Sequence, residues 1–110
     1  SLIEGSTDLI SVIRPDGTVL YDSPAYERVL GYTRADRIGT NALLNVHPDD
    51  VPAVVAAIAA GVDTPGAVAR LEFRYRHKDG SWRQIEGVGS NLLQDPNVGA
   101  IVVNSRDVTE

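Results

Sequence analysis

The chain has 110 residues, of which 43% are hydrophobic and 23% charged, a balance typical of one folded globular domain. Its formal net charge of -5 argues against binding a nucleic-acid backbone, which normally requires a basic face. The absence of cysteine excludes disulfides, thiolate nucleophiles and cysteine-bound metal centres.

The first part of the chain predicts a β-hairpin. Residues 8–13 are rich in aliphatic and β-branched side chains, as strands are. Pro15-Asp16-Gly17 then predicts a turn, because proline presets φ and Asp-Gly supplies the positive φ that reverses the chain. Residues 18–21 are expected to return as the second strand.

Short helices are expected next. Ser23 caps a first helix with Pro24 at its first position, and Gly31 ends that helix. Thr33 caps a second turn over residues 34–37.

A longer helix follows. Residues 41–46 predict a single helical turn before the His-Pro-Asp-Asp sequence at 47–50. The helix itself is predicted over residues 51–60, because apolar residues recur there at helical spacing, namely Val51, Val54, Val55 and Ile58.

The second half of the chain has the period of β-strands. Leu71, Phe73 and Tyr75 alternate with charged residues, which predicts a strand with one dry face. A turn at 78–80 leads into a long strand at 82–93, and a strongly apolar strand follows at 98–103. Some apolar side chains are expected on the other sheet face: Val88, Leu92 and Val102.

Two strands, several short helices and three strands in a meander make an α+β chain. Because strands and helices do not alternate, a parallel sheet is not expected. The helices are expected to pack together on one face of an antiparallel sheet.

Several motifs, in order along nearly the whole chain, resemble the PAS family with its C-terminal PAC portion. They are Pro15-Asp16-Gly17, Ser23-Pro24-Ala25-Tyr26, Leu30-Gly31-Tyr32-Thr33, His47-Pro48-Asp49-Asp50, residues 73–82 and Arg106-Asp107-Val108-Thr109-Glu110. The resemblance implies a five-stranded antiparallel sheet in the order 2-1-5-4-3, with helices enclosing a small pocket on one face. It implies a single domain over 1–110, with a PAS core at about 1–62 and the PAC portion at about 66–110.

No catalytic or metal-binding residues are predicted. His47 belongs to a helix-start loop and His77 to a hairpin turn, and two distant histidines do not make a metal site. Neither a nucleophile elbow nor a phosphate-binding loop is present. Gly87 and Gly89 are expected to ease a bend in a long strand rather than to hold a dinucleotide.

A pocket between helices and sheet is expected to be filled or very small, since protein interiors are normally close-packed. The alternative is an open cavity, because the helix that faces the sheet carries small alanine and valine side chains opposite larger ones on the strands. The candidate pocket residues are Tyr26, Leu30, Asn41, Leu44, Val55, Ile58, Phe73, Tyr75, Ile85, Ile101 and Val103.

We expect either no cofactor or an unidentified small ligand. Light-sensing flavin relatives carry a reactive cysteine in a Gly-x-Asn-Cys segment, and residues 39–42 read Gly-Thr-Asn-Ala. A flavin without an adduct is an alternative, with amide contacts from Asn41, Asn91, Gln94 and Asn104. The haem-binding relatives need a histidine on the helix at 51–60, which has none.

The resemblance implies a sensory module of a multidomain signalling protein, such as a sensor histidine kinase of a two-component system or a diguanylate cyclase. Asp107 and Thr109 then set the geometry of the exit towards an output domain. Asp107 is expected to pair with an arginine on a neighbouring strand, and Thr109 to cap a following helix. A ligand-free dimerisation module is the first alternative.

The expected partners are a second copy of the chain, through the sheet or flanking helices, and a covalently linked output domain. No stretch approaches the roughly 20 apolar residues of a membrane span, so this domain is expected to contact no membrane. We expect a cytoplasmic location, with a parent protein that is either free or membrane-anchored.

Overall fold

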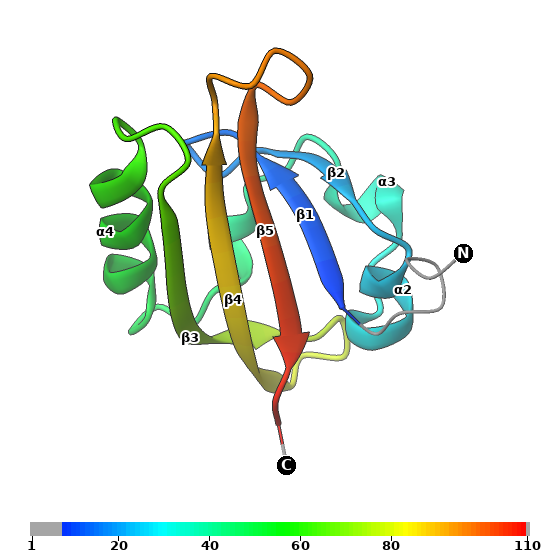
Figure 1. The fold of residues 1–110 in the computed structure, drawn as a ribbon. Helices are drawn as coiled ribbons and strands as arrows, with labels where there is room; N and C mark the ends of the chain where they lie inside the picture. Colours follow the sequence, from blue (N-terminus) through cyan, green and yellow to red (C-terminus); the bar gives the residue numbers. More distant parts are fainter. Residues whose placement is uncertain (1–7, 110) are drawn as a thin grey trace.

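A computed structural model describes residues 8–109. Its centre is an antiparallel five-stranded sheet in the order β2-β1-β5-β4-β3, which confirms the expected topology (Figure 1). The strands are β1 Leu9–Ile13, β2 Val19–Asp22, β3 Val68–Arg76, β4 Trp82–Leu92 and β5 Ala100–Asp107.

In Figure 1, the helix α4 lies beside β3 at the left of the sheet, and the helices α2 and α3 lie at its right, with α2 in contact with β1 and α3 in contact with β2. They connect β2 to β3 along the chain, as the order of the sequence patterns predicted. The helices are α2 Ala25–Leu30, α3 Arg34–Arg37, the 3-10 turn η1 Ala42–Asn45 and α4 Val51–Gly61.

Strand register assigns alternate residues to the two faces of the sheet. On the helix-covered face, Ser11 of β1 pairs with Val103 of β5, and Val103 pairs with Gly89 of β4. These three residues form one row across three neighbouring strands. The next row, on the opposite face, places Val12 beside Val102. Val88, Leu92 and Val102 alternate with residues of the helix-covered face, which confirms that they belong to the other one.

Two local predictions differ from the structure. Ser23 does not cap α2; its hydroxyl instead accepts a hydrogen bond from the Ile10 amide at 3.0 Å, because it lies beside β1. The last strand begins at Ala100 and continues to Asp107. Val98 belongs to the preceding loop, where its amide donates to the Asp95 carbonyl at 3.1 Å.

Candidate functional site

A cavity of about 320 Å³ lies between the sheet and the helices. The expectation of a filled or very small pocket is therefore wrong. The volume is near the lower end of the range of small-molecule sites, about 300–1,000 Å³. Val68 and Ala69 of the edge strand β3 line the cavity and are themselves exposed, so the cavity reaches solvent beside β3.

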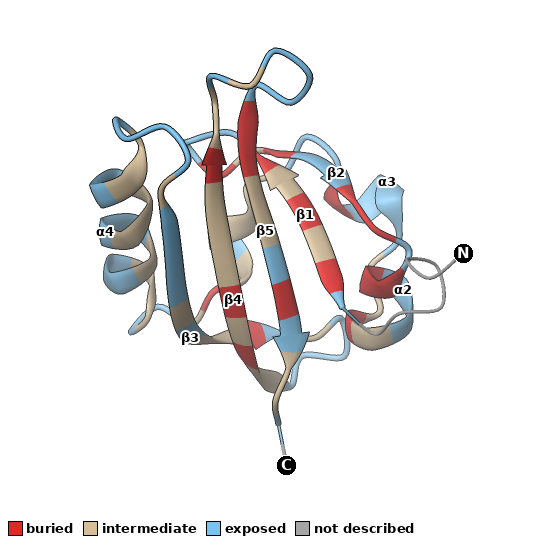
Figure 2. Ribbon diagram, in the orientation of Figure 1, coloured by how far each residue is buried: buried red, intermediate tan, exposed pale blue. Residues whose placement is uncertain are grey.

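Small residues explain why the cavity is not filled. Gly87 and Gly89 lie two residues apart on β4, so both contribute only backbone to the same wall. A Cβ added to Gly89 would meet no atom within 4 Å. Opposite them, α4 contributes Ala57 and Ala60 and has no buried residue along its whole length (Figure 2).

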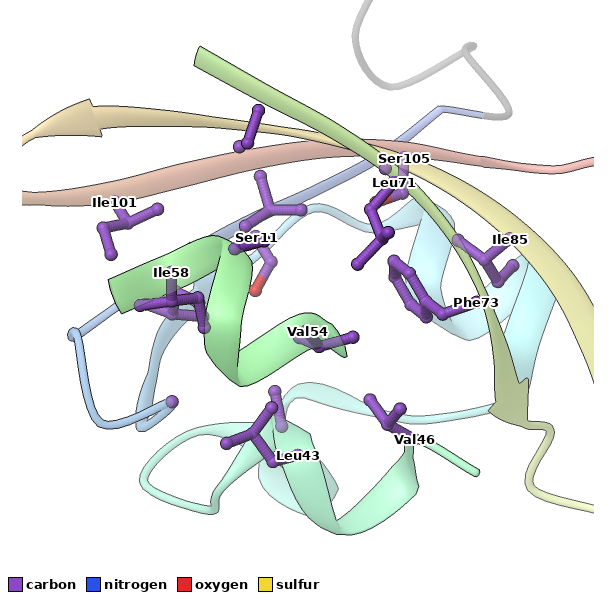
Figure 3. A pocket seen from close by; sticks show the side chains of 18 of the residues that line it. Ser11, Leu43, Val46, Val54, Ile58, Leu71, Phe73, Ile85, Ile101 and Ser105 are labelled. Carbon is purple, nitrogen blue, oxygen red and sulfur yellow. The ribbon is translucent and has the colours of Figure 1, made fainter. Parts of the chain in front are cut away.

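Most of the predicted pocket residues line this cavity. They come from α2, α4, β3, β4 and β5, which the fold brings together around one space (Figure 3). The eight are Tyr26, Leu30, Ile58, Phe73, Tyr75, Ile85, Ile101 and Val103.

The other three predicted pocket residues lie outside it. Leu44 is 81% exposed on the outer side of η1, and Val55 is 44% exposed on the outer side of α4. Asn41 is used by the backbone: its amide nitrogen donates to the Asp16 carbonyl at 2.9 Å and its oxygen accepts from the Leu43 amide at 2.9 Å. Helical spacing alone did not reveal which side of each short helix faces the sheet.

Sequence reasoning missed an ion pair at one end of the cavity. Arg37, which lines the cavity, is 1% exposed, and its Nε donates to Asp22 Oδ2 at 2.6 Å. Its guanidinium also donates to the Tyr75 hydroxyl and lies 4.5 Å from the centre of the Tyr26 ring. No pattern in a charged four-residue helix distinguishes this arginine from its exposed neighbours.

The pKa values of Arg37 and Tyr26, at this end of the cavity, are both raised. Burial acts to lower the pKa of Arg37, but the interactions with Tyr75 and Asp22 outweigh it and raise that pKa above its usual value. Burial, followed by the nearby Tyr75, raises the pKa of Tyr26, so this phenol stays neutral. The arginine charge is therefore permanent and is already matched by Asp22.

Asn91 joins the end of α4 to the sheet. Its side-chain nitrogen lies within hydrogen-bond distance of the carbonyls of Gly61, Val62 and Thr64, at 2.8, 3.0 and 2.9 Å. Its oxygen accepts from the Leu93 amide at 2.9 Å. Asn91 thereby satisfies carbonyl groups at the C-terminal end of α4, which helices otherwise leave without partners.

The amides considered for a flavin do not fit that role. Asn41 and Asn91 are committed to backbone groups, as described above. Asn104 pairs across the sheet with Ile10, on the face away from the cavity, and Gln94 is exposed in a loop. Ala42 lines the cavity in the segment where the photosensing relatives have their cysteine.

The last residues of the domain, 107–109, form what we call the exit segment. Asp107 lies 3.5 Å from Arg83 of β4, as the sequence reasoning expected, and accepts from the Thr109 amide at 2.8 Å. The Thr109 hydroxyl accepts from the Gln84 amide at 2.6 Å. Glu110 lies outside the described residues, so helix capping by Thr109 stays a prediction.

The histidines have local roles at turns. His47 Nδ1 accepts from the Asp49 amide at 3.1 Å, and His77 Nδ1 accepts from the Asp79 amide at 3.0 Å. Within residues 8–109, no three His, Cys, Asp or Glu side chains come together as metal ligands would. No helix in the same range is long and apolar enough to cross a membrane.

Comparison with known proteins agrees with the fold. The chain is 32% identical over 88 residues to the White collar 2 protein of Neurospora crassa, and 32% identical over 90 residues to the White collar 1 protein of that fungus. These matches include 80% and 81% of the chain but only 16% and 8% of the two proteins. The chain thus spans a small fraction of the length of these relatives.

Solved structures of PAS domains superpose closely. That of an HTR-like protein from Haloarcula marismortui gives a TM-score of 0.82 at 22% identity, covering 97% of this chain and 91% of that one. Drosophila melanogaster Cycle PAS-B with bound ethylene glycol gives 0.76 at 19% identity, covering 93% and 99%. A family model described as the PAS fold matches residues 19–104, and the chain accordingly belongs to the PAS family.

Proposed function

We propose that the chain is a non-catalytic sensory module in which a small molecule in the cavity alters the exit segment. One feature carries the proposal: the strand β4 contacts both the cavity-lining helix α4 and the exit segment. Asn91, near one end of this strand, holds the C-terminal end of α4, which lines the cavity. Gln84, near the other end, holds the exit segment through Thr109, and Arg83 approaches Asp107.

A ligand acts on an equilibrium only through different affinities for two states. In this module the two states are a looser and a tighter position of α4, which has no buried residue to hold it against the sheet. A bound molecule adds contacts between α4 and β4 and so favours the tighter position. The Asn91 hydrogen bonds transmit the shift to β4, and the exit segment follows.

The Cycle PAS-B structures were determined with ethylene glycol and with glycerol, so this fold holds small molecules in another protein. For the present chain, the proposal extends to a cytoplasmic signalling protein whose output domain follows the exit segment. A sensor histidine kinase or a diguanylate cyclase is the class of output that the sequence motifs suggest. Catalysis then belongs to that output domain.

Benzene is a suitable first probe, since apolar cavities in proteins bind it. In amide NMR spectra of the wild-type domain, we expect benzene to shift signals of cavity residues and also those of Gln84, Val108 and Thr109. Gly89→Val fills the cavity floor and should weaken binding at least tenfold. Ser90→Val adds the same side chain to the opposite face and should leave binding unchanged.

Two results would count against the proposal in different ways. If benzene fails to bind the wild type, the cavity is not a ligand site. If benzene binds and the three exit signals do not move, the cavity binds ligands but does not communicate with the exit segment.

A second candidate function is association through the face of the sheet that carries no helix. Ile10, Val12, Val88 and Val102 lie half-buried on that face, and Tyr21 is 39% exposed near its edge. Half-exposed apolar side chains grouped on one face are typical of protein contact surfaces. A second copy of the chain is the partner we propose.

Sedimentation velocity over a range of concentrations tests this association. A dimer of the wild type should dissociate in Val102→Arg, which places a charge in the middle of the face. Val98→Arg, in the loop before β5, is the matched control and should leave the dimer intact. A wild-type chain that stays monomeric at high concentration contradicts the dimer.

A further inference from the structure

One buried hydroxyl in the cavity wall has no hydrogen-bond partner. Ser11, on the central part of β1, is 3% exposed, and among the described residues its Oγ is the buried side-chain polar atom left unpaired. Figure 3 shows this oxygen pointing into the space between the sheet and α4. A hydrogen-bond contact from Ser11 acts to lower the pKa of the Tyr26 phenol, against the larger effect of burial, but its geometry falls short of a full hydrogen bond, so Ser11 Oγ keeps capacity for another partner.

The cavity reaches solvent beside β3, so a ligand that fills it also excludes water from this wall. A buried hydroxyl then left without a partner costs about 1–3 kcal/mol. A ligand that supplies the missing partner removes this cost. A serine hydroxyl both donates and accepts, so a hydroxyl or a carbonyl group on the ligand satisfies it.

The other strongly polar groups of the cavity wall are already used. Arg37 donates to Asp22 and to Tyr75, and both charges of the ion pair are buried. The Asn91 amide holds the end of α4 through its nitrogen and the Leu93 amide through its oxygen. An ionised ligand would therefore enter a space with no free countercharge, at a high desolvation cost.

The remaining wall is apolar. Phe73, Leu71 and Ile101 face the space from the strands, and Val54 and Ile58 face it from α4 (Figure 3). Gly89 lies in the same cross-strand row as Ser11, with Val103 between them. Because Gly89 has no side chain, this part of the cavity floor stays open. A hydrocarbon body fits this region when its polar end is at Ser11.

We infer that the cavity takes an uncharged, largely hydrocarbon molecule carrying a single hydroxyl or carbonyl group that hydrogen-bonds Ser11 Oγ. This ligand class rests on the proposed function, because it assigns chemistry to the same cavity. It excludes carboxylates and phosphates, which the charge of Arg37 would otherwise suggest.

Three compounds with one carbon skeleton test the inference: 4-phenylbutan-1-ol, n-butylbenzene and 4-phenylbutyrate. Water solvates the alcohol better than the hydrocarbon, so their absolute affinities are not compared. The informative quantity is the ratio of the dissociation constants of Ser11→Ala and wild type for each compound, measured by NMR titration. This double comparison isolates the contact between the two hydroxyls.

We expect Ser11→Ala to weaken 4-phenylbutan-1-ol about tenfold, because the ligand hydroxyl is then buried without a partner. Binding of n-butylbenzene should be unchanged or stronger. Ser11→Thr keeps the hydroxyl and should retain the preference for the alcohol. Ser105→Ala is the matched control, since Ser105 is a second buried hydroxyl residue of the same wall, on β5.

In the wild type, 4-phenylbutyrate should bind at least a hundredfold more weakly than the alcohol. Equal binding would show that Arg37 is available to anions and would overturn the inference. The inference would also be overturned if the ratio of dissociation constants between Ser11→Ala and wild type were equal for the alcohol and the hydrocarbon. The same holds if Ser105→Ala, and not Ser11→Ala, weakened binding of the alcohol. In these cases the cavity remains a ligand site; if none of the three compounds binds, the proposed function fails with the inference.

Discussion

Arg37 at the end of α3 and Asp22 at the end of β2 form an ion pair, with Nε 2.6 Å from Oδ2 and both side chains at most 2% exposed. The pair ties a four-residue helix to the sheet, because so short a helix has little stability of its own. It also closes one end of the cavity, together with the Tyr75 hydroxyl.

Removing the positive partner should be costly. Arg37→Leu leaves Asp22 as a buried charge without a countercharge, and we expect a loss of about 3–5 kcal/mol in the free energy of unfolding. Urea denaturation measures it. Arg34→Leu, on the exposed side of α3, is the control and should change stability little. The double variant Asp22→Leu/Arg37→Leu should recover much of the loss; a double variant as unstable as Arg37→Leu would contradict this account.

The first hairpin depends on a glycine that lies against Asn41. Gly17 has φ 95°, and an added Cβ would lie 2.6 Å from Asn41 Oδ1. Gly17→Ala therefore incurs the left-handed backbone cost of about 1–2 kcal/mol and also displaces the Asn41 side chain. Gly80→Ala has the same backbone cost at φ 94°, with no atom within 4 Å.

Thermal unfolding of the two glycine variants separates these contributions. We expect Gly17→Ala to be less stable than Gly80→Ala by about 1–2 kcal/mol, since Asn41 bridges the hairpin and η1 with two hydrogen bonds. Equal stability would mean that Asn41 moves aside without loss.

Asp50 should make stability depend on acid pH. Hydrogen bonds from the Arg74 side chain and then from its backbone amide lower the pKa of Asp50 to about 2. A lowered folded-state pKa means that the stabilisation is complete above the unfolded value, near 4, and disappears as the pH falls through about 2.

Asp50→Asn should thus be less stable than the wild type at pH 7, with the difference shrinking below pH 4. Denaturation at a series of pH values measures the difference, which is expected to be modest because the pair is partly exposed. In an Arg74→Leu background the Asp50→Asn substitution should have a smaller effect, because only the backbone amide of residue 74 still donates to residue 50. A difference that is constant down to pH 2 would assign the stabilisation to another cause.

Thr109 should protect the backbone of β4. Its hydroxyl is the acceptor of the Gln84 amide at 2.6 Å, so Thr109→Val should raise the hydrogen-exchange rate of that amide about fivefold. The Glu86 amide, farther along the same strand, should exchange at an unchanged rate. An unaltered Gln84 amide would show that the exit segment is held by other contacts, such as the Val108 amide bonded to the Gln84 carbonyl at 2.8 Å.

Local patterns were sufficient for the order of elements and for an antiparallel sheet, whereas the order of its strands followed from the resemblance to the PAS family. Asp16-Gly17 and Asp79-Gly80 specify turns through backbone conformation alone, and the alternation of Leu71, Phe73 and Tyr75 specifies a strand face through its period of two. These signals act over a few residues, which is why they are legible without the tertiary structure. Residue motifs at characteristic spacings then pointed to the family.

The cavity itself depended on packing between distant segments. Whether Gly87 and Gly89 produce a bend or an open floor is decided by how far α4 stands from the sheet, and no local pattern encodes that distance. The same holds for polar groups: the side-chain nitrogens of Asn41 and Asn91 donate to carbonyls of distant segments, whereas Ser11 lacks a well-formed hydrogen bond. Composition supplied the hydrogen-bonding groups, but only the tertiary arrangement decided which of them remained available, because these partners come from distant parts of the chain.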